Sequence, residues 1–361
     1  LNLSCAFDLS KIRIYELVND LASMSTAASP ENLGHVTCYS EGRTVTRCRF
    51  ERMTRAPVKL VNAKACRISH NQVEWSTCGI TSQGSKKNRI THNDINVSLL
   101  DAAGERVPVG IAWRGHCIGV GSAENGLVVA HNTCTGASWA IENASGSQNS
   151  TGVQITHNVI DAVHCGISAA AEKGAVSKNS ITLSSIGLYG IEVPVAPYTS
   201  VSGNDVYQDS PALLSYGIAS SLDCTGMTIS DNTVRANVGI QLVITSGNAD
   251  KKIKITKNHL DFWTGAIYSS AGGTEATLNT GRCLGLASGR GTGPSAAIQI
   301  ESVFHPSRIR KNVIDGAGAY GIYVVQPQVT EIVDNEIMSP APNYADVLIT
   351  WAAGYPSYPV L

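Results

Sequence analysis

The stretch Ile155-Thr156-His157-Asn158-Val159-Ile160 decides the fold, because its frame recurs along the chain. The frame is an aliphatic residue, two variable residues, an asparagine, one variable residue and a further apolar residue. It returns in close form at Ile68–Val73 and Ile90–Ile95. Self-similarity at a short period is typical of repeat proteins. The asparagine of the frame stands at Asn71, Asn93, Asn132, Asn158, Asn179, Asn204, Asn232, Asn258, Asn312 and Asn335.

A second signature, a small residue followed by isoleucine, comes after most of these asparagines. Two short strands per repeat, with polar connectors and no helical periodicity, predict one coil of a parallel β-solenoid. The long gap between Asn258 and Asn312 divides into two coils if Asn279 marks an irregular coil. The signature reads Gly79-Ile80, Gly110-Ile111, Ala140-Ile141, Gly166-Ile167, Gly190-Ile191, Gly217-Ile218, Gly239-Ile240, Ala266-Ile267, Ala297-Ile298 and Gly321-Ile322.

Stacking explains why such a repeat folds. One coil cannot bury its own apolar face, whereas stacked coils align isoleucines at about 4.8 Å and build a continuous core. Asparagine tolerates a left-handed turn, and its amide can bond to the asparagine one coil away. Leucine-rich repeats and propellers would need leucine frames or four strands per unit. The predicted fold class is therefore all-β, a parallel β-solenoid of about fourteen coils.

This pattern resembles the right-handed parallel β-helix of the pectate-lyase-like superfold from about Leu9 to Ile349. Within it, the long, cysteine-containing solenoid of low charge is most similar to the central domain of bacteriophage tailspike depolymerases. The resemblance implies one β-helix domain over residues 1–349, with 350–361 as a C-terminal extension. It also implies that the asparagine turn separates the second and third sheets, that the Gly-Ile strands form the first sheet, and that substrate binds on the outer face of that sheet.

Composition excludes several classes of function. Lys and Arg number 27 against 28 Asp and Glu, and only 15% of residues are charged, which is unlike a generic nucleic-acid binder or a disordered tail. No apolar run of about 18 residues predicts membrane insertion, and no secretory start is visible. The ten cysteines lack zinc-site spacing and are interpreted as buried fillers of a protein made in a reducing cytosol. The start at Leu1 and the abrupt stop at Leu361 are interpreted as marking a fragment of a longer protein.

Three segments between repeats are predicted to be surface loops: Ser98–Val109, Gln208–Ser215 and Ser269–Ser295. The glycine-rich third segment lacks the lysine of a phosphate loop, so no nucleotide site is expected. The basic run Arg308–Lys311 flanks an ordinary repeat and is interpreted as structural. No metal and no cofactor are predicted, because histidines that recur at the same turn favour a structural stack. These histidines are His70, His92, His131 and His157.

The residue after each small-Ile pair should point outward, since side chains alternate along a strand. Only Glu142 and Glu192 are acidic on this outward stripe. They are predicted to lie two coils apart, with Ser168 between them, so that their backbones are about 9.6 Å apart. Leaning side chains would bring the carboxyls within the roughly 6.5–9.5 Å of an inverting glycosidase, or near the 5 Å of a retaining one. The two are the candidate catalytic acid and base; alternatively, both are solvated strand residues.

Residues around this pair are candidate sugar contacts. Trp139 and Tyr268 offer rings on which sugars stack, although Trp139 could instead turn into the core. His164 is either a base for β-elimination or a structural residue. A second stripe with Tyr207, Arg235 and Asp261 is interpreted as an anionic-glycan contact, a subunit contact or an exposed ion pair. The predicted substrate-binding residues are Trp139, His164, Ser168, Asp209, Asn237, Gln241 and Tyr268.

The resemblance implies a tailspike-type depolymerase that binds and cleaves bacterial surface polysaccharide, capsule or O-antigen, by glycoside hydrolysis. Two rivals stay open. One is a polysaccharide lyase acting on uronic acids through His164 or Tyr268, and the other is a non-catalytic adhesin. Implied partners are two further copies in a homotrimer and other virion tail proteins, with no nucleic acid. The expected location is the virion tail, after synthesis in the bacterial host cytoplasm and with action outside the cell.

Overall fold

The computed structural model describes residues 3–4, 9–17, 34–53, 56–100, 106–107, 115–121, 123–143, 150–209, 215–243, 252–271, 273–285, 296–301, 306–316, 320–325, 330–338 and 346–350. Every secondary-structure element in these residues is a β-strand, and none is a helix that could cross a membrane. The chain divides into two compact units, Leu1–Ser184 and Ser185–Leu361, and each is described by itself.

One row of strands, the pre-Asn row, precedes the frame asparagines. In the first unit its strands are β2 (Leu9–Ser10), β5 (Thr44–Thr46), β8 (Arg67–Ser69), β11 (Arg89–Thr91), β16 (Val128–Ala130), β18 (Gln154–Thr156) and β20 (Ala175–Ser177). In the second unit they are β23 (Ser200–Ser202), β26 (Thr228–Ser230), β28 (Ile253–Thr256), β30 (Thr274–Thr277), β33 (Ser307–Arg310) and β36 (Thr330–Val333). Neighbours pair in parallel, as β11 does with β8 and β26 with β28.

A second row, the post-Asn row, follows the asparagines. In the first unit it contains β3 (Arg13–Leu17), β6 (Arg49–Met53), β9 (Gln72–Ser76), β12 (Asp94–Val97), the first parts of β17 (Thr133–Asn143) and β19 (Val159–Ala169), and β21 (Ser180–Leu183). In the second unit it contains β24 (Asp205–Gln208), the first parts of β27 (Thr233–Leu242) and β29 (His259–Ser269), β31 (Thr280–Cys283), β34 (Val313–Asp315) and β37 (Glu336–Met338).

The third row, the Gly-Ile row, carries the small-Ile signature. In the first unit it contains β1 (Leu3–Ser4), β4 (Gly34–Cys38), β7 (Ala56–Val61), β10 (Ile80–Gln83), β15 (His116–Val120) and the last parts of β17 and β19. In the second unit it contains β22 (Tyr189–Glu192), β25 (Tyr216–Ser220), the last parts of β27 and β29, β32 (Ala296–Glu301), β35 (Tyr320–Val325) and β38 (Val347–Thr350).

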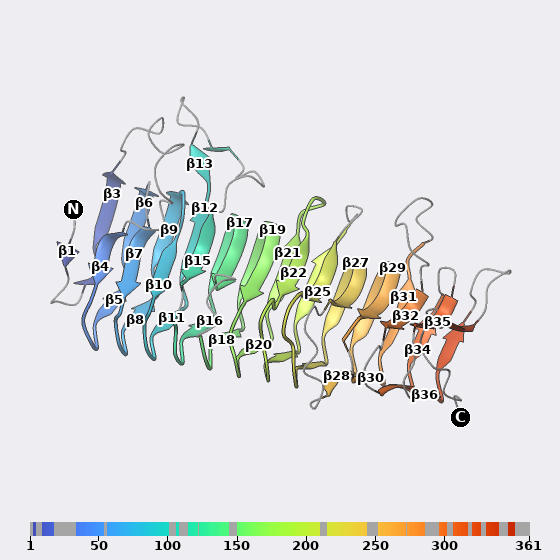
Figure 1. Cartoon of the computed structure of the whole chain (residues 1–361). Helices are drawn as coiled ribbons and strands as arrows, with labels where there is room; N and C mark the ends of the chain where they lie inside the picture. The colour runs from blue at the N-terminus through green and yellow to red at the C-terminus, as the bar shows by residue number, and fades with distance from the viewer. Residues whose placement is uncertain are drawn as a thin grey trace. The chain divides into compact units, whose positions relative to one another are not determined.

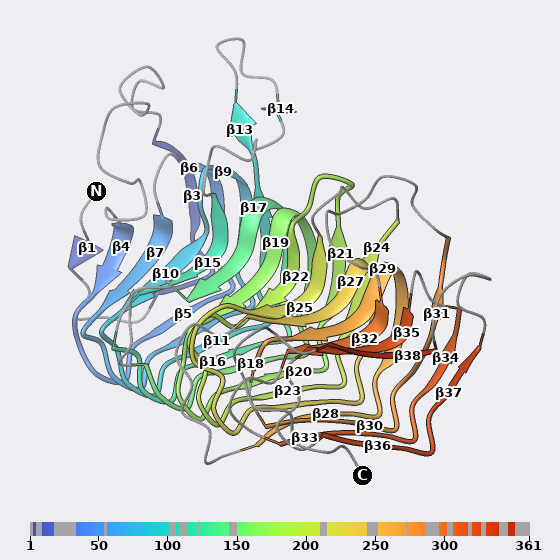
Figure 2. The same cartoon turned by 45° about the vertical axis from the view of Figure 1, so that its right-hand side comes forward.

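These rows confirm the predicted fold class, a parallel β-helix. Figure 1 shows successive strands of the first unit side by side, and Figure 2 shows its pre-Asn strands below those of the Gly-Ile row. The pre-Asn row has seven described strands in the first unit and six in the second, which is close to the expected number of coils. One expectation was wrong: the post-Asn and Gly-Ile rows are not separate sheets, because β17, β19, β27 and β29 run through both without a break.

The frame asparagines form the predicted ladder. Asn132 Nδ2 donates to Asn158 Oδ1 at 3.0 Å and to the Ile90 carbonyl at 3.0 Å, and Asn132 Oδ1 accepts from Asn93 Nδ2 at 2.9 Å. Asn279 joins the ladder, with its Oδ1 2.9 Å from Asn258 Nδ2, so the irregular coil is confirmed. The ladder satisfies buried backbone groups that a turn would otherwise leave without partners.

The left-handed residue is the one before the asparagine, not the asparagine itself as expected. His70, His92, His131 and His157 all have φ of 56° or 57°. Their rings stack, with centroids 4.8–4.9 Å apart, which confirms the structural stack. The asparagine is needed for the ladder, so the preceding residue takes the strained conformation.

Crowding explains the small residue of the small-Ile pair. A Cβ added at Gly217 would lie 2.0 Å from Val234 Cγ1, and one at Gly190 would lie 2.3 Å from Val206 Cγ1. Both valines are fully buried core residues of the post-Asn row. The pair therefore marks where the Gly-Ile strand passes closest to the core side chains of the row before it.

The predicted loops are partly regular. Ser98–Val109 contains the antiparallel pair β13 (Leu99–Leu100) and β14 (Arg106–Val107), and Ser269–Ser295 contains β30 and β31 of a full coil. The loop expectation for Ser269–Ser295 was therefore wrong over those strands, because Asn279 completes the ladder there. Of the nine cysteines in the described residues all are free, and eight are buried fillers as expected.

Candidate functional site

The outward stripe of the Gly-Ile row runs in register through the first unit. Thr81 pairs with Lys59 on one side, and Gly119 pairs with Glu142, which in turn pairs with Ser168. Thr81, Lys59, Glu142 and Ser168 are all buried, although the inward positions beside them are the core isoleucines. A carboxylate and an ammonium therefore sit among hydroxyl side chains on a face that excludes water.

Glu142 forms a buried ion pair with a histidine on the neighbouring coil. His116 Nδ1 lies 2.8 Å from Glu142 Oε2, and the two side chains are only 5% and 10% exposed. A buried charge persists only when it is paired, so the carboxylate and the imidazole hold each other in place. The two groups are close enough to pair when the imidazole is protonated, but the contact does not have the geometry of a hydrogen bond. An acid and an imidazole in contact are groups that can move a proton.

Two aromatic rings flank this pair. Trp139 is the register partner of His116, and its ring centroid lies 5.5 Å from that of His164. Both rings are partly exposed. Trp139 is thus not buried in the core, and the structure brings together four residues of one face: Trp139, His164, Glu142 and His116.

His116 and Lys59 were missed by sequence reasoning. The expected stripe residue of that coil followed Gly110-Ile111, which lies outside the described residues. In the structure Ile118 pairs with Ile80 and Ile141, so Gly119 fills the stripe position and His116 precedes it by three. Cys117-Ile118 also satisfies the small-Ile signature, and it was the signal that could have found His116.

Glu192, the second predicted catalytic carboxylate, belongs to the second unit. It ends β22 on the outward stripe, in register with Ala219, and is partly exposed. The in-register pairing of Glu142 with Ser168 agrees with the predicted stripe. The separation between the Glu142 and Glu192 carboxyls spans the two units and stays a prediction.

The outward stripe continues in the second unit with Gln241, Tyr268 and Gln299 in register. Gln299 Nε2 donates to Glu301 Oε1 at 3.0 Å, and the Tyr268 hydroxyl bonds to the same carboxylate. Burial, and then the Glu301 charge and this hydrogen bond, raise the pKa of Tyr268 to about 12. Tyr268 therefore stays a neutral hydroxyl that can bond to sugar, and it is a poor base at neutral pH.

Asn237 and Asp209 have other surroundings. Asn237 is buried, and its Oδ1 accepts from the Thr264 hydroxyl at 2.8 Å. Asp209 follows β24 and pairs with Arg235 at 3.3 Å, so it lies on the post-Asn row rather than on the outward stripe of the Gly-Ile row. Their predicted role in binding substrate is not tested by these contacts.

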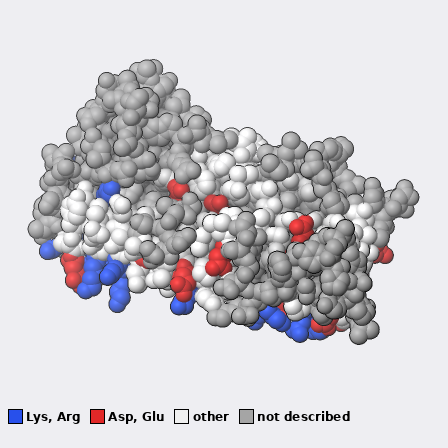
Figure 3. All heavy atoms as spheres, viewed as in Figure 1, with Lys and Arg blue, Asp and Glu red and all other residues white. Residues whose placement is uncertain are grey.

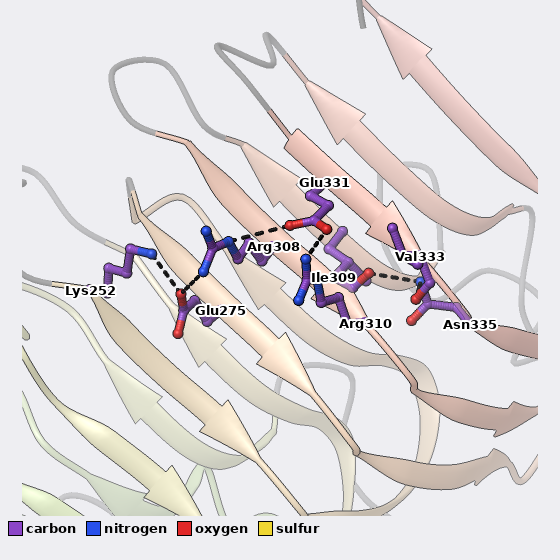
Figure 4. Close-up of polar contacts among 8 residues, drawn as sticks. All are labelled: Lys252, Glu275, Arg308, Ile309, Arg310, Glu331, Val333 and Asn335. Atoms are coloured by element: carbon purple, nitrogen blue, oxygen red, sulfur yellow. Dashed lines mark hydrogen bonds and ion pairs between the residues drawn. The ribbon is translucent and has the colours of Figure 1, made fainter. Parts of the chain in front are cut away.

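Charged side chains lie on both the pre-Asn and the post-Asn rows. In Figure 3 most of the blue side chains lie along the lower edge, and several red ones lie above it. In the second unit the charges of the pre-Asn row pair with one another (Figure 4): Glu275 binds Lys252 at 2.7 Å and Arg308 at 3.3 Å, and Glu331 binds Arg308 and Arg310. The basic run Arg308–Lys311 is thus part of a surface ion-pair network.

Glu124 is a buried acid inside the first unit that sequence reasoning also missed. Its Oε1 accepts from the Ser82 hydroxyl at 2.9 Å and from the Ser85 amide at 3.2 Å, whereas its Oε2 has no partner. Burial raises the pKa of Glu124 to about 7, against the opposing effect of these two bonds. The folded protein therefore holds a proton there that the unfolded chain releases at lower pH.

Stability should fall as pH rises through the range set by Glu124. Its pKa is about 7 when folded and 4.5 in the reference state, so its stabilising contribution is complete below pH 4.5 and lost by about pH 7. The loss is roughly 3 kcal/mol at about 1.36 kcal/mol per pKa unit. Urea unfolding of Glu124→Gln from pH 4.5 to 8 should lack this slope, while Glu172→Gln, an exposed partner of Lys173, should keep it. Parallel slopes for Glu124→Gln and the parent protein would contradict the assignment.

The coils, the asparagine ladder and the stripe define the chain as a parallel β-helix protein with a candidate site on the outer face of its Gly-Ile row. A family model described as "Periplasmic copper-binding protein (NosD)" matches residues 122–337, more than half of the 361 residues. The chain belongs to the NosD family. No curated protein matches it.

Several solved structures are similar to the chain at low identity. The DFA-IIIase of Arthrobacter chlorophenolicus A6 in complex with DFA-III matches at 12% identity and TM-score 0.45, covering 78% of this chain and 75% of its own. The surface protein and adhesin PfbA of Streptococcus pneumoniae matches at 9% and 0.42, covering 86% and 77%. The tailspike gp61 of Pseudomonas phage phi297 matches at 12% and 0.43, covering 86% of this chain and 48% of the tailspike chain. No functional residue is carried over from these structures.

Proposed function

We propose that this protein binds a bacterial surface polysaccharide along the outer face of the Gly-Ile row and cleaves it by glycoside hydrolysis. The observation that carries the proposal is the buried His116–Glu142 pair on that face. A buried acid in contact with an imidazole needs a reason there, because the stripe beside it holds hydroxyl side chains and the inward positions hold core isoleucines. Proton transfer to a glycosidic oxygen supplies one.

Glu142 is one of the two proposed catalytic carboxyls, and His116 is its positioning residue. The His116 imidazole lies 2.8 Å from the carboxyl and holds it at a fixed place. Glycoside hydrolysis needs a second carboxylate as base or nucleophile. Glu192 is the other acid of the predicted stripe and the candidate that the sequence offers for that role; it belongs to the second unit.

Aromatic and amide side chains on the same row suit a sugar chain. Trp139 and His164 lie beside Glu142 in the first unit. In the second unit Tyr189 and Tyr216 stack at 5.7 Å on neighbouring coils, and Tyr268, Gln299 and Glu301 form a hydrogen-bonded group. Sugars stack their apolar faces on such rings and bond to amides and carboxylates.

A second candidate function is β-elimination from a uronic acid. The His116–Glu142 contact supports it, because an imidazole beside a carboxyl group is a suitable base for a proton next to a carboxylate. His116 takes this role better than Tyr268, whose pKa of about 12 keeps the hydroxyl neutral. A third candidate is an adhesin that binds through the same rings and does not cut.

The biological setting of the proposal is that of a phage tailspike. In this setting three copies of the chain form a homotrimer, and the trimer contacts other virion tail proteins. The protein takes no cofactor and acts on capsule or O-antigen outside the cell. These points rest on the resemblance of the repeat pattern to tailspike depolymerases. The family name instead suggests a periplasmic protein, so the setting and the chemistry are tested separately.

The family name also suggests copper, and the described residues do not fit it. They bring no three His, Cys, Asp or Glu side chains together in a way that could hold a metal ion. The stacked histidines present one ring per coil at 4.8–4.9 Å, face to face, so their nitrogens do not converge. Burial raises the pKa of the Cys117 thiol well above its usual value, which disfavours the thiolate that copper would need. No step of the proposed reaction uses a metal.

Product analysis separates the three candidate functions. Purified protein incubated with capsular and O-antigen polysaccharides should release new reducing ends without near-ultraviolet absorbance, because hydrolysis leaves no double bond. Absorbing products would replace hydrolysis with β-elimination. Binding to a polysaccharide that stays at full length would leave the adhesin as the function.

A further inference from the structure

Arg235 is held between two aromatic rings on the outer face of the post-Asn row. Its guanidinium carbon lies 5.1 Å from the Tyr207 ring centroid and 5.5 Å from that of Trp263. Tyr207 belongs to β24 and Trp263 to β29, the strands on either side of β27, which carries Arg235. The rings therefore cover opposite faces of the guanidinium, and its edge is what stays open to a ligand.

The open edge is only weakly occupied by the chain itself. Arg235 Nη2 donates to Asp209 Oδ1 at 3.3 Å, and the Tyr207 hydroxyl donates to the same oxygen at 3.3 Å. The Asp209 side chain is 75% exposed, and Arg235 Nε is buried without a partner. The Asp209 carboxylate is thus weakly bound at the edge of the Arg235 guanidinium, and a stronger hydrogen-bond acceptor could replace it there.

The next arginine on this face lacks these features. Arg282 donates to Asp261 Oδ2 from both Nε and Nη2, at 3.3 and 3.2 Å, and Asp261 is 13% exposed. No aromatic ring contacts Arg282 in the described part of the chain. The charge of Arg282 is thus neutralised by Asp261. Arg235 differs from Arg282 in its two aromatic neighbours and in the exposed carboxylate that it binds.

We propose that Tyr207, Arg235 and Trp263 form a binding site for a carboxylate-bearing sugar residue, whose carboxylate displaces Asp209 from the guanidinium edge. A carboxylate is planar and can bind the guanidinium in its own plane through two parallel hydrogen bonds. A phosphate or sulfate can bind the same edge through two of its oxygens, but its other oxygens lie above and below that plane and need more room next to the two rings. The slot between the rings therefore favours a carboxylate.

The rings also favour a sugar as the carrier of this carboxylate. Tyr207 is 40% exposed, so part of its ring is free to stack on the apolar face of a pyranose. The choice of a sugar rests on the proposed function, which has a polysaccharide as substrate. Binding at this site does not depend on Glu142 or on cleavage, because these residues belong to the post-Asn row of the second unit.

The test is binding of oligogalacturonate, followed by calorimetry and by the fluorescence of Trp263. The fully methyl-esterified oligomer serves as the neutral probe of the same shape. We expect oligogalacturonate to bind and the ester to bind about tenfold to a hundredfold more weakly, as for loss of a charge-assisted bidentate contact. Asp209→Asn should tighten binding about twofold to fivefold, because the competing charge is removed.

Arg235→Gln should weaken binding as much as esterification does, whereas the matched change Arg282→Gln should leave it unchanged. Trp263→Phe should remove the fluorescence response and keep the calorimetric one. Equal binding of acid and ester, or an unchanged affinity in Arg235→Gln, would overturn the proposal. Glu142→Gln should bind with parental affinity. Loss of cleavage together with retained binding would therefore separate this site from the proposed catalysis.

Discussion

Replacing Glu142 with glutamine should lower the rate of polysaccharide cleavage by about 10²–10⁴-fold, the usual contribution of a positioned acid or base. Glutamine keeps the shape and the contact to His116 but cannot give up or take a proton. Binding should be retained, so the loss should appear in kcat and not in KM. Reducing-end assays of the parent and the variant on the same polysaccharide measure both constants.

His116 should act through Glu142, and its variants can show this. In His116→Ala the buried carboxylate loses its partner, which lies 2.8 Å away, so the pH optimum of cleavage should shift as well as the rate. His116→Asn keeps an N–H donor near the place of Nδ1 and should recover part of the activity. A purely structural histidine would change stability without moving the pH profile.

A matched control is Glu74→Gln. Glu74 lies on the post-Asn row and pairs with Arg49 at 2.8 Å, so its loss should change cleavage less than about twofold. Full activity in Glu142→Gln would remove Glu142 from the mechanism. A loss in Glu142→Gln with no effect in Glu192→Gln would keep the first carboxylate and require a different second one.

The coil structure was predictable because its determinants are local and repeated. The ladder asparagine and the small-Ile pair sit in nearly every coil, and each has a physical cause: unpaired backbone groups at the turn, and the close approach of Gly217 to Val234. The error over Ser269–Ser295 came from one coil whose frame reads Ala276-Thr277-Leu278-Asn279, with alanine where isoleucine was sought. The hydrogen bonds of Asn279 to its neighbours in the ladder hold this coil in place although its local apolar pattern is weak.

The candidate site was less predictable, because it depends on contacts between coils. Outward placement of Glu142 and Ser168 follows from alternation along the strand. The contact between Glu142 and His116 could not be predicted in this way. His116 comes from a coil of irregular length, and the pair Gly110-Ile111 predicted the wrong residue opposite Glu142. Asp209 was predicted to lie in a loop next to the Glu142 and Glu192 stripe, whereas its contact to Arg235 holds it on the post-Asn row.

Replacing Asn132 with alanine should have the largest effect on stability, about 3–5 kcal/mol. The Asn132 Oδ1 accepts from the Asn93 backbone amide at 3.0 Å as well as from its side chain, and its Nδ2 donates to the Ile90 carbonyl. Alanine removes these partners from the Asn93 backbone amide and the Ile90 carbonyl, at about 1–3 kcal/mol each. The Asn93 side-chain amide keeps its bond to the Ile68 carbonyl at 3.1 Å. Urea unfolding should show a lower midpoint at an unchanged slope.

Asn132→Asp separates the ladder from simple loss of volume. A carboxylate can accept from Asn93 but cannot donate to Asn158 Oδ1 or to the Ile90 carbonyl, and its charge is buried. The variant should therefore be least stable at neutral pH and recover in part in acid, where a protonated carboxyl can donate one bond. Asn125→Ala provides the control, because Asn125 is exposed and pairs only through its backbone. Equal losses in Asn132→Ala and Asn125→Ala would mean that the amide stack does not hold the coils together, and that isoleucine packing alone does.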